Sequence, residues 1–241
     1  MKAIICFTTI LLISSIAFSQ SVLNYQSGTG VVIQPGADVC ADQVVINGTF
    51  SGGGTICGSI AYSLNLTAFI QGFYNPSSNS MISDTVTIYL RNATTPFAKK
   101  DSAKSVLTAS GTGSFIFFNI TNGTNYYLVI RHRNSIETWS SSAIAFSAGT
   151  LTYDFTPAAN KAFGSNQIQV DISPVRFAIY SGDVNQDGVV DLTDGSMIDN
   201  DASNFITGYV NTDVNGDNVV DLADATIADN NAFNFVGVIR P

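Results

Sequence analysis

Apolar and polar residues alternate in short runs along most of this chain, and the runs are separated by Gly, Asn, Ser and Pro. Runs of about four to eight residues that are rich in Val, Ile, Thr, Tyr and Phe predict half-buried β-strands. Such runs lie at residues 64–71, 84–90, 114–120, 126–133, 143–146, 151–155, 167–172 and 175–180. The pattern predicts a mainly β protein with an antiparallel β-sandwich over residues 61–180.

The N-terminus has the composition of a secretory signal. Met1 and Lys2, an apolar run over residues 3–16 and the end Ala17-Phe18-Ser19 predict a signal peptide over residues 1–20. A membrane anchor is the alternative, but the run is shorter than the roughly twenty apolar residues that a spanning helix needs. We therefore expect a secreted protein, extracellular or at the cell surface, with no membrane span. Residues 21–60 are then expected to form a small N-terminal β segment.

Cys40 and Cys57 are the cysteines that remain after removal of the signal peptide. Because secreted proteins meet an oxidising environment, the two are expected to form a disulfide bond. The bond would close a loop of about seventeen residues and stabilise the fold by about 3 kcal/mol in the chain-entropy model. A metal-binding or catalytic thiol is the alternative, although the Cys-x-x-Cys spacing is absent.

A pattern of acidic and amide residues occurs twice near the C-terminus, thirty residues apart. Calcium takes about six to eight oxygen ligands, and a 12-residue loop supplies them from positions 1, 3, 5, 9 and 12 and from the backbone carbonyl at position 7. In the first loop these are Asp183, Asn185, Asp187, Asp191, Asp194 and the carbonyl of Val189. In the second loop they are Asp213, Asn215, Asp217, Asp221, Asp224 and the carbonyl of Val219. The repeat predicts two Ca²⁺ sites, and an acidic, solvated loop is the alternative.

Position 6 of such a loop turns sharply, usually through a left-handed conformation, and Gly is expected there. The first loop has Gly188, whereas the second has Asn218. Asn is the residue other than Gly that best tolerates this conformation, so we expect a slightly strained or weaker second site.

The repeat continues beyond the loops, because fourteen of twenty-four positions are identical between residues 183–206 and 213–236. The segment after each loop lacks Pro and begins at an Asp suited to capping, which predicts a helix of two or three turns. One copy is too short to bury its own apolar face, so the two copies are expected to pack as a pair. The expected contacts join Leu192, Met197, Ile198 and Phe205 to Leu222, Ile227, Phe233 and Phe235.

Negative charge is concentrated in this repeat. Of the eighteen acidic residues, eleven lie within residues 183–241, together with one basic residue, Arg240. These charges repel one another at neutral pH, and two bound Ca²⁺ would return four positive charges. We therefore expect calcium to order the repeat, with about 2.7 kcal/mol of stabilisation per site when free Ca²⁺ is a hundredfold above its dissociation constant.

The paired loops resemble a type I dockerin module, over residues of about 182–241. The resemblance implies that each repeat is a calcium loop followed by one helix, and that residues 181–241 fold into a small α-helical module that docks into a cohesin domain. Dockerins commonly carry a Ser-Thr type pair at loop positions 10 and 11, whereas this chain has Leu192-Thr193 and Leu222-Ala223. The expected partner is a cohesin-like domain, or else another copy of the same chain.

The hairpin pattern at residues 113–120 and 122–130 is similar to that of transthyretin-like and Cna-B-like surface modules, which implies an architecture and no activity. Catalytic candidates in the sandwich are few: Asp84, Asp101, Glu137, Asp154, Asp171 and one histidine, His132, between Arg131 and Arg133. His132 is expected at a solvated strand edge. A polysaccharide-degrading enzyme would need a clustered carboxylate pair, and no recognisable nucleophile motif accompanies these residues, so we predict a protein without enzymatic activity.

Aromatic side chains suggest a possible polysaccharide ligand. Rings that stack on sugars would come from Tyr62, Phe69, Phe73, Tyr74, Tyr89, Tyr126, Tyr127, Trp139 and Tyr153, although core packing is their more ordinary role. The acidic chain has only ten basic residues, which argues against nucleic-acid binding. The sequence favours a secreted, calcium-binding assembly protein that docks to a partner or self-assembles into extracellular fibres. An accessory carbohydrate-binding or polysaccharide-degrading component on a cohesin-bearing scaffold is the alternative.

Overall fold

The computed structural model describes residues 22–26, 30–46 and 49–241, so the predicted signal peptide lies outside the described residues. One sheet has the strand order β1 (Val22–Tyr25), β3 (Asp38–Ile46), β5 (Thr55–Thr67) and β10 (Thr112–Phe117), and β14 (Thr150–Asp154) also pairs with β5. The other has the order β12 (Ser135–Trp139), β11 (Asn125–His132), β8 (Asp84–Asn92) and β9 (Lys99–Leu107), and β13 (Ile144–Ala145) also pairs with β11.

Smaller elements complete the described part of the chain. Short strands pair as β2 (Gly30–Val32) with β4 (Thr49–Ser51), β6 (Tyr74–Asn75) with β7 (Ser80–Met81), and β15 (Ile168–Ile172) with β16 (Val175–Ala178). Two 3₁₀ turns, η1 (Ala159–Lys161) and η2 (Phe163–Ser165), precede β15. The α-helices are α1 (Leu192–Ser203) and α2 (Leu222–Phe233), and in the described residues no helix is long and apolar enough to cross a membrane.

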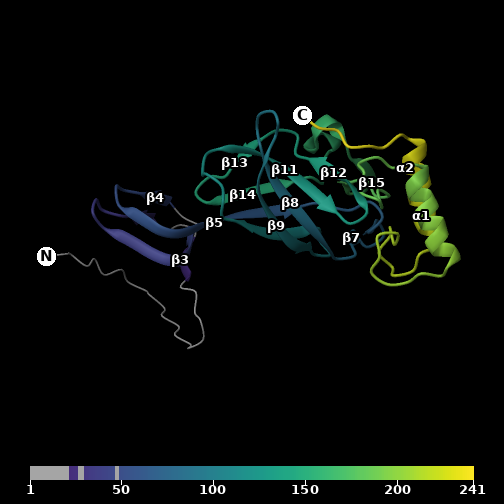
Figure 1. The fold of residues 1–241 in the computed structure, drawn as a ribbon, viewed down its shortest axis with the longest axis horizontal. Coiled ribbons are helices and arrows are strands. Elements are labelled where there is room, and N and C mark those ends of the chain that lie inside the picture. Colours follow the sequence, from purple (N-terminus) through teal and green to yellow (C-terminus); the bar gives the residue numbers. More distant parts are fainter. Residues whose placement is uncertain (1–21, 27–29, 47–48) are drawn as a thin grey trace.

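The sheet that contains β5 is not antiparallel as the sequence predicted. β1 runs parallel to β3, β3 to β5 and β14 to β5, and only β10 is antiparallel to β5. The cause is the path of the chain. β2 and β4 also pair in parallel, so successive N-terminal strands run in the same direction and are not joined as hairpins. β5 then passes through residue 60, where a boundary was expected, into the body of the molecule (Figure 1).

The core of the sandwich lies between the two sheets. Leu64 and Phe115 contribute from one sheet and Ile88 and Leu128 from the other, and all four are fully buried. Buried and half-buried residues alternate along β8, as the period of a strand requires. The prediction missed β9, because its exposed positions include Lys100, Ser102 and Lys104, and this polarity hides the strand pattern.

A second core joins the C-terminal repeat to the sandwich. Its members are mostly small or β-branched side chains: Val184, Val190, Ile198, Val214, Val220, Ala225, Ala228 and Val236, together with Ile136 of β12. Figure 1 shows α1 and α2 side by side at one end of the body, with the C-terminal segment returning over the sandwich. The two predicted helices are confirmed, and each begins after an Asp N-cap, Asp191 or Asp221.

The predicted apolar contacts between the helices are largely wrong. Ile198 is buried in this core and Ile227 packs against it, but the remaining six residues are exposed: Leu192, Met197, Phe205, Leu222, Phe233 and Phe235. The core of the repeat includes the alanines Ala225 and Ala228, whose small side chains allow close packing. Phe205 and Phe235 follow the C-caps in a left-handed conformation, with φ of 53° and 54°, and project into solvent.

Candidate metal centre

Each acidic loop is organised around the carboxylate at its position 12. Asp194 Oδ1 accepts hydrogen bonds from the backbone N–H of Val184 at 2.9 Å and of Asn185 at 3.2 Å, and its Oδ2 accepts from Asp191 N–H at 3.0 Å. Asp224 in the second loop repeats all three contacts with Val214, Asn215 and Asp221. Both carboxylates are fully buried, so they tie the start of each loop to the first turn of its helix.

Side chains at positions 3 and 5 curl the loops through local turns. Asn185 Oδ1 accepts from Asp187 N–H at 2.7 Å, and Asp187 Oδ1 accepts from Val189 N–H at 3.0 Å. The second loop has the same pair of contacts at 2.8 Å each. At position 6, Gly188 has a φ of 96° and Asn218 a φ of 68°, so the predicted left-handed turn is confirmed in both loops.

Asp183 at position 1 of the first loop carries an unsatisfied oxygen. The residue is 2 % exposed, and its Oδ2 accepts from Gly188 N–H at 3.2 Å. Its Oδ1 is buried and has no hydrogen-bond partner among the described residues. Burial, with repulsion from Asp194 and Asp187, raises the pKa of Asp183 to about 7. A buried carboxylate oxygen without a donor, beside two further carboxylates, fits a bound cation.

The loops do not form a ready cluster of acidic ligands. Among the described residues, no group of three or more His, Cys, Asp or Glu side chains is arranged to hold a metal ion. The carboxylates at positions 5, 9 and 12 accept hydrogen bonds from the backbone of their own loop instead. Amide and carbonyl oxygens complete calcium sites of this kind, and calcium binding at both loops stays a prediction.

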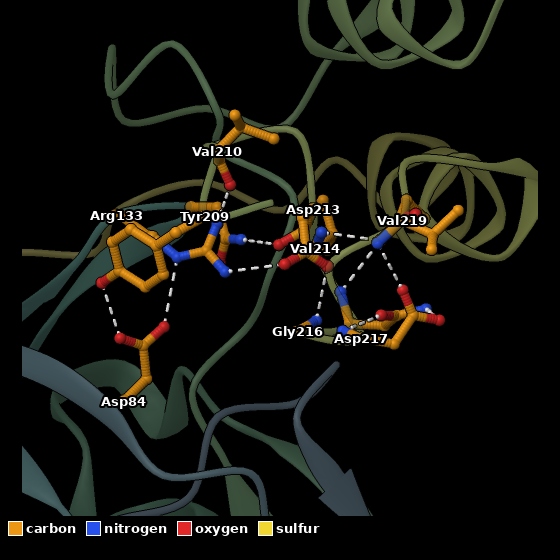
Figure 2. Close-up of polar contacts among 12 residues, drawn as sticks. Asp84, Arg133, Tyr209, Val210, Asp213, Val214, Gly216, Asp217 and Val219 are labelled. Carbon is orange, nitrogen blue, oxygen red and sulfur yellow. Dashed lines mark hydrogen bonds and ion pairs between the residues drawn. The ribbon is translucent and has the colours of Figure 1, made fainter. Parts of the chain in front are cut away.

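The first residue of the second loop contacts the sandwich directly. Asp213 Oδ1 accepts from Gly216 N–H at 2.8 Å, and its Oδ2 accepts from Arg133 Nη2 at 3.2 Å. Arg133 Nη1 donates to the carbonyl of Val210, and the guanidinium lies 4.5 Å from the centre of the Tyr209 ring. Figure 2 shows the guanidinium between Asp84 of the sandwich and Asp213 of the loop.

Asp84 completes this junction from the side of the sandwich. It accepts from Arg133 Nε at 3.1 Å, from the Tyr209 hydroxyl at 2.6 Å and from Thr85 N–H at 2.6 Å, and it pairs with His132 Nε2 at 3.1 Å. Burial opposes ionisation, but these hydrogen bonds outweigh it and hold the pKa of Asp84 well below its usual range. The prediction of a solvated His132 is wrong, because His132 is buried and Ser135 Oγ lies 3.1 Å from its Nδ1.

The other candidate carboxylates lie on separate elements and have separate partners. Asp101 accepts from the N–H groups of Phe118 and Asn119, and Glu137 pairs with Trp139 Nε1 and Arg240. Asp154 binds Thr156, and Asp171 accepts from the Tyr74 hydroxyl and Ser173 N–H. These contacts assign the carboxylates structural roles, and the absence of enzymatic activity stays a prediction.

The aromatic residues do not make the flat platform that sugar stacking needs. Six of the nine candidates are buried: Tyr62, Phe69, Phe73, Tyr74, Tyr126 and Trp139. Neighbouring rings meet at steep angles, such as 51° between Phe69 and Tyr74 and 63° between Tyr127 and Trp139. These rings serve packing, so they do not support the polysaccharide alternative.

Cys40 and Cys57 lie opposite each other in neighbouring strands. Their Cα atoms are partners in the parallel register of β3 and β5. Neighbouring strands are about 4.8 Å apart, within the range of Cα separations that a disulfide spans. The side chain of Cys57 lies outside the described residues, so the predicted bond stays a prediction.

Comparisons with known proteins assign no family. Neither the protein-family models nor the curated proteins include a match to this chain. A solved C-terminal-interface mutant of a type II cohesin–X–dockerin complex from Acetivibrio cellulolyticus is similar over 72% of this chain and 99% of the matched chain, with 16% identity and a TM-score of 0.42. An N-terminal-interface mutant of that complex is similar over 73% and 97%, with 16% identity and a TM-score of 0.37. Such scores do not establish a shared fold, so neither structure assigns a function here.

Proposed function

We propose that this chain is a secreted, non-enzymatic assembly protein whose C-terminal repeat binds Ca²⁺ and joins the sandwich to a protein partner. The observation that carries the proposal is the buried, unpartnered Oδ1 of Asp183 in a loop with calcium-ligand spacing. The first ion would be held by Asp183, Asn185, Asp187, Asp191, Asp194 and the carbonyl of Val189. The second would be held by Asp213, Asn215, Asp217, Asp221, Asp224 and the carbonyl of Val219.

Bound Ca²⁺ supplies positive charge that offsets the repulsion among the loop carboxylates. The protein itself supplies the rigidity. Asp191 and Asp194 form a capping box at the start of α1, and Asp221 and Asp224 form one at the start of α2. Each loop is therefore joined rigidly to the first turn of the helix that follows it.

The exposed apolar side chains of the repeat support a docking role. Leu192 and Leu222 are 83% and 77% exposed, and Phe205 and Phe235 are 87% and 91% exposed. These equivalent residues of the two copies offer apolar side chains for a partner to cover. The partner is a cohesin-like domain or another copy of this chain. In the second case the exposed Lys99, Lys100 and Lys104 of β9 offer charge complementary to the acidic repeat.

Light scattering of residues 21–241 at high concentration, with Ca²⁺ and after chelation, tests both parts of the proposal. Calcium-dependent oligomers or filaments are the result expected from self-assembly. A monomer whose melting temperature rises with Ca²⁺ supports calcium binding and directs the search to a separate cohesin-like partner. An unchanged melting temperature and an unchanged mass with Ca²⁺ would contradict calcium-dependent assembly, and retention on insoluble polysaccharide would favour the carbohydrate-binding alternative.

A further inference from the structure

The two loops differ at position 1, although their sequences are nearly the same there. In each loop one oxygen of the Asp accepts a backbone N–H, from Gly188 to Asp183 at 3.2 Å and from Gly216 to Asp213 at 2.8 Å. The second oxygen of Asp183 has no partner among the described residues. The second oxygen of Asp213 binds Arg133 Nη2 at 3.2 Å. The second loop therefore already holds a positive charge at the point where the first loop has an unsatisfied oxygen.

Arg133 is held firmly at this position. Its side chain is 10% exposed, and it lies in the turn between β11 and β12. Asp84 binds its Nε from the sandwich, while the rings of Tyr209 and Phe73 lie 4.5 and 5.4 Å from the guanidinium carbon. The next residue, Asn134, donates from Nδ2 to the carbonyl of Asp213 at 2.7 Å. A guanidinium fixed by so many contacts does not move away without cost.

We infer that Arg133 is a built-in cation of the second loop, which holds that loop on the sandwich without metal and leaves the first loop as the tighter Ca²⁺ site. This inference rests on the proposed calcium-binding function and goes beyond it, because it gives the two sites unequal roles. The first loop responds to calcium, whereas the second loop is a fixed joint between the repeat and the sandwich. Because Ca²⁺ must share or displace a charge-assisted hydrogen bond at Asp213, binding there is expected to be about tenfold to a hundredfold weaker.

Asn218 offers a competing cause for a weaker second site. Its φ of 68° places a residue with a Cβ in the left-handed region, where the first loop has Gly188. The two causes predict different results for two variants. If Arg133 weakens the site, Arg133→Gln strengthens Ca²⁺ binding in the second loop and Asn218→Gly changes it little. If Asn218 weakens the site, Asn218→Gly alone makes the two sites equal.

Calorimetric titration of CaCl₂ into chelator-treated residues 21–241 is the test. Wild type is expected to show one tight site and a second about tenfold or more weaker. Asp183→Asn should remove the tight site, whereas the matched Asp213→Asn should leave it intact. Arg133→Gln should bring the second site to within about threefold of the first, and its melting temperature should depend more on Ca²⁺ than that of wild type.

Two controls separate this role from simple structural support. Arg133→Lys keeps the positive charge and should retain the difference between the sites. Arg176→Gln removes an arginine of β16 that donates to the carbonyl of Val175 in its own strand, at 3.3 Å, so it should leave both sites unchanged. If Arg133→Gln does not fold without Ca²⁺, it can be purified with Ca²⁺ and titrated with chelator. If the second site of this variant then binds Ca²⁺ no more tightly than that of wild type, the inference is wrong.

The outcomes distinguish the inference from the proposed function. Two equal tight sites in wild type, equal losses in Asp183→Asn and Asp213→Asn, or equalisation by Asn218→Gly alone would overturn the role of Arg133 while calcium binding stands. No heat of binding and no thermal shift in wild type would overturn calcium binding itself, and the inference with it.

Discussion

The side-chain amide of Asn231 in α2 donates a hydrogen bond of 2.7 Å to Oε1 of Gln71, which lies between β5 and β6 of the sandwich. The same amide donates to the carbonyl of Ser181 at 2.7 Å. Asn231 is buried, so these bonds replace water at the contact between the helix and the sandwich. The equivalent residue of the first repeat is Asp201, which accepts from the Thr212 hydroxyl at 2.6 Å. The repeats have therefore diverged at a position where α2 contacts the sandwich.

Asn231→Asp should destabilise the protein strongly. The substitution removes both donors and places a carboxylate against two acceptor oxygens in a buried position, so we expect a loss of about 3 kcal/mol or more in the free energy of unfolding. Asp201→Asn is the matched control, because an amide oxygen can still accept from Thr212, and its effect should stay below about 1 kcal/mol. Urea denaturation of both variants measures the difference. Equal losses would show that Asn231 does not join the helix to the sandwich in the way described.

Gly72→Ala should destabilise the contact between the sandwich and the repeat, because the added methyl group has no room there. A Cβ at Gly72 would lie 2.2 Å from the carbonyl oxygen of Val214, which is a backbone atom of the second loop and has little freedom to move. We expect a loss of about 2 kcal/mol or more, from overpacking. Gly123→Ala is the control, since nothing lies within 4 Å of its Cβ and only its φ of +77° opposes a side chain, at about 1 kcal/mol. Thermal denaturation should rank Gly72→Ala as clearly the more harmful.

Sequence reasoning succeeded where the structure is local. The Asp191 and Asp221 caps and the left-handed position 6 depend on neighbours in the chain, and both features appear in the structure. β8 was predicted for a similar reason, because alternation along a strand records which face is buried.

It failed where position depends on distant parts of the chain. Arg133 and His132 are polar residues beside a turn, and their burial depends on Asp84 and on the repeat that arrives about eighty residues later. Nothing local distinguishes such an arginine from a solvated one. The one available signal was the density of polar residues from Arg131 to Asn134 in a chain with only ten basic residues. The parallel pairing of the N-terminal strands was not predicted for the same reason, because the direction of pairing is set by the path of the chain between strands.

Acid should destabilise the protein through His132. Burial lowers the pKa of His132, and its hydrogen bond to Asp84 only partly opposes this effect. The unfolded chain therefore binds a proton more readily, so the stability contributed by neutral His132 is complete above the unfolded pKa of about 6.5 and is lost as pH falls below it. We expect a loss of up to about 1.4 kcal/mol per pH unit between pH 6.5 and 5, measured by urea denaturation.

His132→Asn is the comparison for this effect, because the chain has no other histidine. The variant should be less stable than wild type at pH 7.5 and should lose less between pH 7.5 and 5. Asp183, whose raised pKa acts in the opposite direction, is common to both proteins and cancels in the comparison. Parallel pH profiles for the two proteins would exclude His132 as the titrating group.

Phe205 and Phe235 should matter for assembly and not for folding. Both are almost fully exposed, and both have a left-handed backbone, with φ of 53° and 54°, which costs a bulky residue roughly 1–2 kcal/mol. Replacing both by Asn, which tolerates this conformation, should leave the free energy of unfolding unchanged or raise it, while calcium-dependent oligomers in light scattering disappear. Ile172→Asn is the matched control, since Ile172 is exposed on β15 of the sandwich and has no counterpart in the repeat. Only the surface that a partner covers should be sensitive to an added polar group. Loss of assembly in Ile172→Asn but not in the double variant would therefore place the docking surface on the sandwich and not on the repeat.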